Sequence, residues 1–394
     1  MSEAQALDVA PARFGAAARA EWPLDPAVTY LNHGGYGVAP HAVLAAQRAW
    51  RERIERNPTR FHAREQPHSL RDAAAKVAAA LGTSGETLVF VENATSGVNA
   101  VLRSLPLKPG DEIVATSLAY PAVLNAARFT AERAGAILRE VPLSLPVSGA
   151  ESVIDAVLAA LGPRTRIVII DHIASGSALV LPVNSIVRRC RERGVPVLVD
   201  GAHAPGQILL DLDALDADWY VGTLHKWFFA PRACGILRAA PVARQILHPL
   251  AISHGLGQGF AAEFDWTGTH DFTTALAAPD GLDFHRALGG RDLMARNAAL
   301  VRSAANGLAA SWRTEAAGPP EMFAAMASVR LPIDGDATPD RAVRVARWLA
   351  EAHRIEAAVI CAGRALWIRV AAQAYNEAAD YHTLEAAIAM GVPP

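Results

Sequence analysis

The chain has 394 residues, of which 52% are hydrophobic and 19% charged, and its formal net charge is −2. This composition excludes an intrinsically disordered chain, and the length suffices for one large and one smaller domain with separate hydrophobic cores. The near-zero charge excludes the bulk attraction to nucleic acid or anionic membranes that a strongly basic protein has, so we expect neither of these partners.

The sequence also lacks the features of secreted, membrane-spanning and metal-binding proteins. It begins without the basic and apolar regions of a secretory signal, and it contains no apolar run of about 18 residues that could span a membrane. Its three cysteines, Cys190, Cys234 and Cys361, are too scattered for a disulfide framework or a thiolate metal site. We therefore expect a cytoplasmic protein without a bound metal.

From residue 86 to residue 239, short β-type runs alternate with helix-like segments. The predicted strands are residues 87–91, 112–116, 136–143, 166–170, 195–200, 218–222 and 234–239. Near-continuous apolar strands that alternate with helices predict a mostly parallel sheet with helices on both faces, which is an α/β fold. Ligands of such sheets lie beyond the carboxyl ends of the strands, so the loops after the strands are the expected site.

The pattern changes after about residue 270. A strand at 326–332 precedes a helix at 338–355, with Thr338 as its N-cap and Pro339 in its first turn. Strands at 355–362 and 365–373 and a final helix after Asn376 complete a smaller α+β module. We predict an N-terminal segment (1–25) that packs on the small domain, a large cofactor-binding domain (26–270) and the small domain itself (271–394).

The segment GTLHKWFFAP, residues 222–231, places Lys226 beside three aromatic residues. Of the 37 lysines and arginines, only Lys76, Lys108 and Lys226 are lysines, so arginine is the usual choice where the chain needs positive charge. A lysine differs from an arginine in having a primary amine that can lose its proton and attack a carbonyl. Lys226 is therefore a candidate for covalent chemistry. The alternative is a stem packed on apolar surface with a solvated ammonium.

Polar groups with complementary chemistry lie in other strands and strand-end loops. Thr95 and Ser96 begin a helix whose N-terminus either binds a phosphate or is merely capped. Asp200 ends a strand, where it either caps a helix or faces a cationic ring nitrogen. Arg369 lies on a strand and suits either a carboxylate ligand or an internal salt bridge. Together with a Schiff-base lysine, these groups indicate a pyridoxal-phosphate enzyme that acts on an amino acid.

Five segments also carry a family resemblance. NATSGVN, VDGAHAPG, GTLHKW, DWTGTHD and IRVAAQAYN, in this order, resemble the class V aminotransferase family of fold-type I enzymes, with isopenicillin N epimerase-like and cysteine desulfurase-like proteins nearest in appearance. The likeness runs from about Tyr30 to Asn376. It implies pyridoxal 5'-phosphate as cofactor, a large domain with a seven-stranded sheet, and a homodimer with shared active sites.

The resemblance also implies a role for each matched residue. Lys226 would hold the cofactor covalently and Asp200 would face its ring nitrogen, so both are predicted to be catalytic. The other cofactor-binding residues would be Tyr120 stacked on the ring, His203 and Ser175 near the phenolic oxygen, Thr95, Ser96, Thr223 and His225 at the phosphate, and Thr269 at the phosphate of the neighbouring subunit. Arg369 would bind the substrate α-carboxylate, and Asn32, His33 and Gly34 would line the same pocket.

The implied reaction begins when the Lys226 amine removes the Cα proton of the substrate. Desolvation by the aromatic neighbours predicts a depressed pKa for this amine. Epimerisation and elimination of a β-substituent, as in a C–S lyase, are the main expectations, and transamination is an alternative. A cysteine desulfurase would need a mobile nucleophilic cysteine, for which Cys361 is the candidate, although its place in a short hairpin predicts a packed thiol. The non-enzymatic alternative is a binding module on the same fold.

Overall fold

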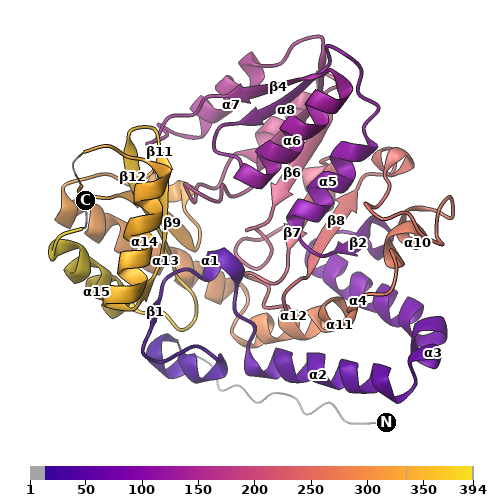
Figure 1. Ribbon diagram of the computed structural model, residues 1–394, viewed down its shortest axis with the longest axis horizontal. Coiled ribbons are helices and arrows are strands. Elements are labelled where there is room, and N and C mark those ends of the chain that lie inside the picture. Colours follow the sequence, from indigo (N-terminus) through magenta and orange to yellow (C-terminus); the bar gives the residue numbers. More distant parts are fainter. Residues whose placement is uncertain (1–13, 334, 393–394) are drawn as a thin grey trace.

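The computed structural model describes residues 14–333 and 335–392, and a seven-stranded sheet lies at the centre of its larger part (Figure 1). The strand order is β2–β8–β7–β6–β5–β3–β4. The strands are β2 (Leu88–Val91), β3 (Glu112–Thr116), β4 (Ile137–Val141), β5 (Thr165–Asp171), β6 (Val197–Gly201), β7 (Trp219–Thr223) and β8 (Gly235–Ala239). β8 is antiparallel to both its neighbours, and the other neighbouring pairs are parallel. The predicted seven-stranded, mostly parallel sheet is thus confirmed.

Both faces of this sheet are buried, which explains the near-continuous apolar strands. Along β5, Ile167 and Ile169 join one hydrophobic cluster, whereas Val168 and Ile170 join another. Successive strand residues point to opposite faces, so the two clusters occupy the two sides of the sheet. The helices that connect or flank the strands are α4 (Gln66–Ala80), α5 (Ala94–Ser104), α6 (Pro121–Ala134), α7 (Ala150–Ala159), α8 (Val183–Arg191), α9 (Leu212–Leu215) and α12 (Ala278–Ala287).

A three-stranded antiparallel sheet of order β11–β12–β9 organises the C-terminal part, drawn in orange and yellow in Figure 1. Its elements are β9 (Met326–Arg330), β11 (Ala358–Ala362), β12 (Ala365–Ala371), α13 (Arg291–Trp312), α14 (Pro339–His353) and α15 (Ala378–Ala389). The Thr338 hydroxyl accepts the backbone N–H of Arg341 at 3.2 Å, as predicted for the N-cap of α14. The strand predicted at 355–362 is divided, because β10 (Ile355–Glu356) pairs with β1 (Thr29–Tyr30) instead.

The remaining elements surround the two sheets. They are η1 (Gly15–Glu21), α1 (His33–Tyr36), α2 (His41–Arg56), α3 (Pro58–Arg60), a π-helix (Phe61–Glu65), η3 (Gly85–Thr87), η4 (Ala243–Ile246), α10 (Phe260–Asp265), α11 (Thr273–Leu276) and η5 (Pro320–Met322). Within the described residues, no helix is long and apolar enough to cross a membrane.

The N-terminal segment joins the two parts of the molecule. Its first 13 residues lie outside the described residues. In the rest, the backbone N–H of Gly15 donates to the carbonyl of Ala374 at 2.7 Å. Trp22 packs against Phe229, Phe284 and Tyr375 with ring centroids 5.8, 5.4 and 5.1 Å away. The segment thus contacts both large-domain and C-terminal residues, while the domain boundaries at residues 25 and 270 stay predictions.

Trp22→Ala should lower the free energy of unfolding by about 3–5 kcal/mol, because it removes a large aromatic side chain that is only 2% exposed. Chemical denaturation would measure the loss. Val242→Ala, at a side chain that is 77% exposed, is the matched control and should change the free energy by less than about 0.5 kcal/mol. Equal effects of the two substitutions would mean that the N-terminal segment is not docked as described.

Candidate active site

The candidate site lies where β5, β6 and β7 end. Asp171 and Asp200 are register partners at the ends of β5 and β6, and Thr223 is the last residue of β7. Parallel strands present their carboxyl ends at one edge of the sheet, so the loops that follow converge there. These loops carry Ser175, His203 and Lys226, which the sequence places far apart.

Lys226 follows β7 and points its amine at His203. Lys226 Nζ lies 3.2 Å from His203 Nε2. Burial and, to a smaller extent, the charge of Arg369 lower the pKa of the Lys226 amine from its ordinary 10.5 to about 8, although the carboxylate of Asp200 opposes the shift. The direction agrees with the sequence prediction. Trp227, Phe228 and Phe229 are all buried and continue into the hydrophobic core behind the amine.

Two carboxyl groups share the buried end of the sheet. Asp200 Oδ1 accepts the backbone N–H of Ala202 at 2.9 Å, and a turn rather than a helix follows, so Asp200 is not a helix cap. Burial raises the pKa of both Asp171 and Asp200. The pKa of Asp171 rises well above its usual range because the charge of Asp200 adds to the effect of burial. Asp171 is therefore the carboxyl that keeps its proton, and Asp200 is the one poised to face a cation.

Arg369, on β12, is buried at the same site without a carboxylate partner among the described residues. Its guanidinium donates to the Ser175 carbonyl at 2.6 Å and to Asn32 Oδ1 at 2.8 Å. Burial lowers its pKa to about 10, still far above neutrality. The internal salt bridge that the sequence left open is thus not found among residues 14–333 and 335–392. A buried, charged guanidinium held only by neutral acceptors is suited to an anionic ligand.

Residues 32–37 pass directly over the lysine loop. A Cβ atom at Gly34 would meet Met326 and would lie 3.5 Å from His203 Cε1. Gly37 has φ +65°, and a Cβ there would collide with the backbone carbonyl of His225. The His33 ring is fully buried, with Nδ1 2.8 Å from the Tyr375 hydroxyl and Nε2 3.0 Å from the Lys226 carbonyl. Both His33 nitrogens are engaged within the protein, so the side chain offers none to a substrate.

The start of α5 is the place where the sequence predicts phosphate binding. Asn93 Oδ1 accepts the Ser96 backbone N–H at 2.9 Å, which caps the helix. Gly97 lets α5 approach β7, because a Cβ there would lie 2.8 Å from Val221 Cγ1. His225 Nδ1 lies 2.9 Å from the carbonyl oxygen of Cys234 and 3.1 Å from its backbone nitrogen, and burial lowers the pKa of this histidine to about 4. In the neutral tautomer whose Nδ1 accepts the Cys234 N–H, the other ring nitrogen is a hydrogen-bond donor.

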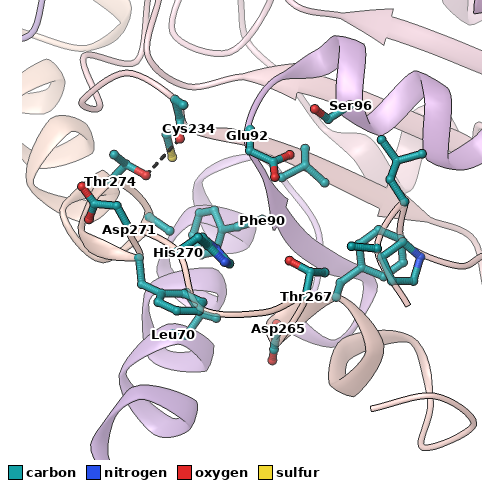
Figure 2. Close-up of a pocket in the computed structure, with 18 of the residues that line it drawn as sticks. Leu70, Phe90, Glu92, Ser96, Cys234, Asp265, Thr267, His270, Asp271 and Thr274 are labelled. Atoms are coloured by element: carbon teal, nitrogen blue, oxygen red, sulfur yellow. Dashed lines mark hydrogen bonds between the residues drawn. The ribbon is translucent and has the colours of Figure 1, made fainter. Parts of the chain in front are cut away.

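A cavity of about 470 Å³ lies beside this helix N-terminus, and Figure 2 shows the residues that line it. Ser96, Glu92, Thr267 and His270 line it. Thr269 is exposed on the same loop as Thr267 and His270, and no described contact joins it to the site around Lys226. The ring of Tyr120, which precedes α6, is 44% exposed, and its backbone N–H faces the Asp171 carboxyl.

Sequence reasoning missed the part played by Tyr375. This residue lies in the matched segment IRVAAQAYN, but its hydroxyl contacts His33 across 342 positions of the chain. No local pattern reveals such a contact. The one available signal was the position of Tyr375 just after the strand that carries Arg369.

Known proteins show similarity over nearly the whole chain. A model of the family "Aminotransferase class-V" matches residues 29–340. A probable chloroplastic L-cysteine desulfhydrase of Arabidopsis thaliana is 32% identical, covering 92% of this chain and 83% of that protein. Isopenicillin N epimerase of Amycolatopsis lactamdurans is 33% identical, covering 94% of this chain and 97% of that protein.

Solved structures share the fold. The cystine C–S lyase C-DES, in complex with its reaction product cysteine persulfide, superposes with a TM-score of 0.78 at 25% identity, covering 94% of this chain and 99% of that chain. An apo cysteine desulfurase of Thermococcus onnurineus NA1 gives a TM-score of 0.80 at 19% identity over 97% of this chain and 98% of that chain, which is a likeness of fold. The chain therefore belongs to the aminotransferase class-V family of pyridoxal-phosphate-dependent enzymes.

Proposed function

We propose that this enzyme eliminates the sulfur substituent from Cβ of a cysteine-type amino acid, with Lys226 as the base at Cα. The observation that carries the proposal is the pairing of two buried cations in one site. One is an amine with a lowered pKa, and the other is Arg369, a guanidinium with no carboxylate partner among the described residues. An α-amino acid supplies both a carboxylate for the guanidinium and a Cα proton for the amine.

The residues of the site fit the family's cofactor. His203 Nδ1 and Ser177 Oγ are buried without a hydrogen-bond partner in the described part of the chain, which is costly unless a polar ligand supplies one. Lys226 would hold pyridoxal phosphate covalently, Asp200 would pair with its ring nitrogen, and Tyr120 would stack on it. Ser175 and His203 would bind the phenolic oxygen, and Thr95, Ser96, Thr223 and His225 the phosphate. When bound, the cofactor takes up the electron pair released as a Cα bond breaks.

The protein's own groups then account for the reaction. Arg369 binds the substrate carboxylate, and because Ser175 and Asn32 hold the guanidinium from two sides, the substrate is fixed in orientation. Lys226 removes the Cα proton as a neutral amine. The Cβ–S bond breaks with its electron pair going to sulfur, and the proton on Lys226 passes to the departing sulfur. With cysteine and one water, the balanced products are pyruvate, ammonia and hydrogen sulfide.

Elimination suits this site because it needs one base at Cα, whereas epimerisation needs a base on one face of the substrate and a proton donor on the other. The three histidines around Lys226 are already engaged: His33 contacts Tyr375 and the Lys226 carbonyl, His225 contacts the backbone of Cys234, and His203 contacts the Lys226 amine. Epimerisation remains a second candidate because isopenicillin N epimerases are 33% and 34% identical to the chain. Tyr120 would then be the second proton donor.

A desulfurase reaction is less well supported. Cys361 lies within β11 rather than in a loop, and its Sγ contacts the Ala337 carbonyl at 3.3 Å. A cysteine that attacks the sulfur of a bound substrate needs freedom to move. The packed position of Cys361 favours a structural thiol.

We further propose a cytoplasmic homodimer in which Thr269 reaches the cofactor phosphate of the other subunit. Thr269 is exposed, which suits a contact outside its own subunit. Leu250, Ile252 and Leu256 are 47%, 56% and 55% exposed in the nearby segment, and such apolar groups are typical of an interface. Cys190, Cys234 and Cys361 are free thiols, in keeping with a reducing compartment.

Lys226 should react with an amine-directed reagent along a pH profile centred near 8 in the cofactor-free protein, because only the neutral amine reacts and its fraction rises through the pKa. Mass spectrometry of a digest measures the modification, with the exposed Lys76 and Lys108 as internal references. Arg369→Met removes a positive charge and should move the profile to higher pH, whereas Arg330→Met, at an exposed ion pair with Glu315, should not. A profile for Lys226 that matches the two exposed lysines would contradict the proposal.

Lys226→Ala should abolish the visible absorbance of the bound cofactor and lower kcat by about 10²–10⁴-fold or more, since it removes the general base as well as the covalent attachment. The substrates to test are L-cysteine and its S-conjugates in D₂O, with pyruvate, sulfide and Cα deuterium as readouts. Pyruvate release supports elimination. Deuterium exchange without pyruvate would favour the epimerase alternative. A wild-type protein that binds no pyridoxal phosphate would contradict both the elimination and the epimerisation proposals.

Subunit mixing tests the shared site. Lys226→Ala and Thr269→Glu subunits should each form inactive homodimers, whereas their hybrid should recover one intact site, because both defects fall in the other site. Activity of the mixture is compared with that of the separate variants. Lys226→Ala mixed with Asp200→Asn is the control, since each subunit then damages its own site and no recovery is expected. Absence of recovery in the first mixture would rule out the exchange of Thr269.

A further inference from the structure

A buried chain of hydrogen bonds connects the C-terminal part of the molecule to the lysine loop. The Tyr375 hydroxyl lies 2.8 Å from His33 Nδ1, and His33 Nε2 lies 3.0 Å from the Lys226 carbonyl. His33 is 0% exposed and Tyr375 is 1% exposed, so no solvent competes for these bonds. Three segments that are distant in sequence therefore meet directly behind the candidate base.

The chemistry of the three groups fixes the direction of each of these hydrogen bonds. A carbonyl oxygen only accepts, so His33 Nε2 must carry the proton that it shares with Lys226. A neutral His33 then has a lone pair on Nδ1, and the Tyr375 hydroxyl must donate to it. Burial lowers the pKa of His33 to about 4 and raises that of Tyr375 well above its usual range. Both groups therefore stay neutral near pH 7, and the donor and acceptor of each hydrogen bond stay the same.

Tyr375 is itself held in a rigid loop. The backbone carbonyl of Gln373 accepts from Arg296 at 2.8 Å, and Gln373 Oε1 accepts the Ala374 N–H at 2.8 Å. Asn376 Nδ2 donates to the Tyr30 carbonyl at 3.0 Å. This loop follows β12, the strand that carries Arg369. Strand β12 thus carries the Arg369 guanidinium, and the loop that follows it holds the Tyr375 hydroxyl behind Lys226.

The adjacent residues Asn32 and His33 connect Arg369 with the backbone of Lys226. Asn32 Oδ1 accepts from Arg369 at 2.8 Å, and His33 donates to the Lys226 carbonyl. We propose that His33 and Tyr375 are positioning residues that act through the backbone of Lys226 and set the place of its amine relative to Arg369. The proposal rests on the proposed role of Lys226 as the catalytic lysine. It gives Tyr375 a function and moves His33 from the substrate pocket to the support of the base.

Tyr375→Phe is the direct test, because it removes the hydroxyl and keeps the ring that packs on Trp22. In the cofactor-loaded enzyme we expect kcat to fall about 3–10-fold, the worth of one buried hydrogen bond, with KM unchanged within about twofold. The pH profile of Lys226 modification should move up by roughly half a unit to one unit as the amine becomes less constrained. Tyr381→Phe is the matched control: it deletes a buried hydroxyl bonded to the Ala371 carbonyl at 2.9 Å, away from Lys226.

A second pair of variants separates positioning from packing. His33→Leu loses both hydrogen bonds, whereas His33→Gln keeps an N–H donor and an acceptor, so His33→Gln should recover most of the lost kcat. Tyr375→Phe should have no added effect in the His33→Leu background, because the two residues act in one chain. Equal behaviour of Tyr375→Phe and Tyr381→Phe, or a change in KM alone, would overturn the proposal. These outcomes are read in a protein that binds pyridoxal phosphate, so they are distinct from a failure of the proposed function.

Discussion

The constraint on which the site depends is the burial of two cations at one edge of the large sheet. Lys226 and Arg369 each lose hydration, and the charge of Arg369 adds to the lowering of the Lys226 pKa. The two cations respond differently. A guanidinium keeps its proton even when buried, whereas an amine can give its proton up. The result is a permanent positive charge beside an amine that is partly neutral near pH 8, which is the asymmetry that carboxylate binding and proton abstraction require.

The fold supplies this asymmetry from three separate parts. Parallel strands deliver Asp200 and the lysine loop to one edge, the C-terminal sheet delivers Arg369, and the segment at residues 32–37 lies between them. The glycines of that segment matter because a Cβ at Gly37 would collide with the backbone beside Lys226. Side chains of neighbouring residues then reach in two directions, Asn32 to the guanidinium and His33 to the lysine backbone. Figure 1 shows α1, which His33 begins, between the C-terminal part and the large sheet.

The sequence predicted the large sheet well because its signals are local. Buried parallel strands have continuous apolar runs, and each of the seven predicted ranges overlaps the strand that formed. Such signals do not predict long-range pairing. Residues 355–356 run directly into the rest of their predicted strand, yet they pair with residues 29–30. In the site, too, local features were predictable from the sequence and long-range contacts were not. Lys226 was identifiable from the scarcity of lysine, but the contact of His33 with Tyr375 depends on the folded arrangement of distant segments.

Charge balance explains why this site suits an anionic ligand at Arg369. Asp171 keeps its proton, so Asp200 is the one carboxylate that offsets Lys226 and Arg369 when both are charged. Asp200 acts on the amine, whereas Arg369 has only the neutral oxygens of Ser175 and Asn32. A substrate carboxylate would therefore be drawn to the guanidinium and would relieve the charge that lowers the pKa of the amine. Substrate binding would thus raise the basicity of Lys226 at the moment when it has a proton to remove, which couples recognition of the carboxylate to catalysis at Cα.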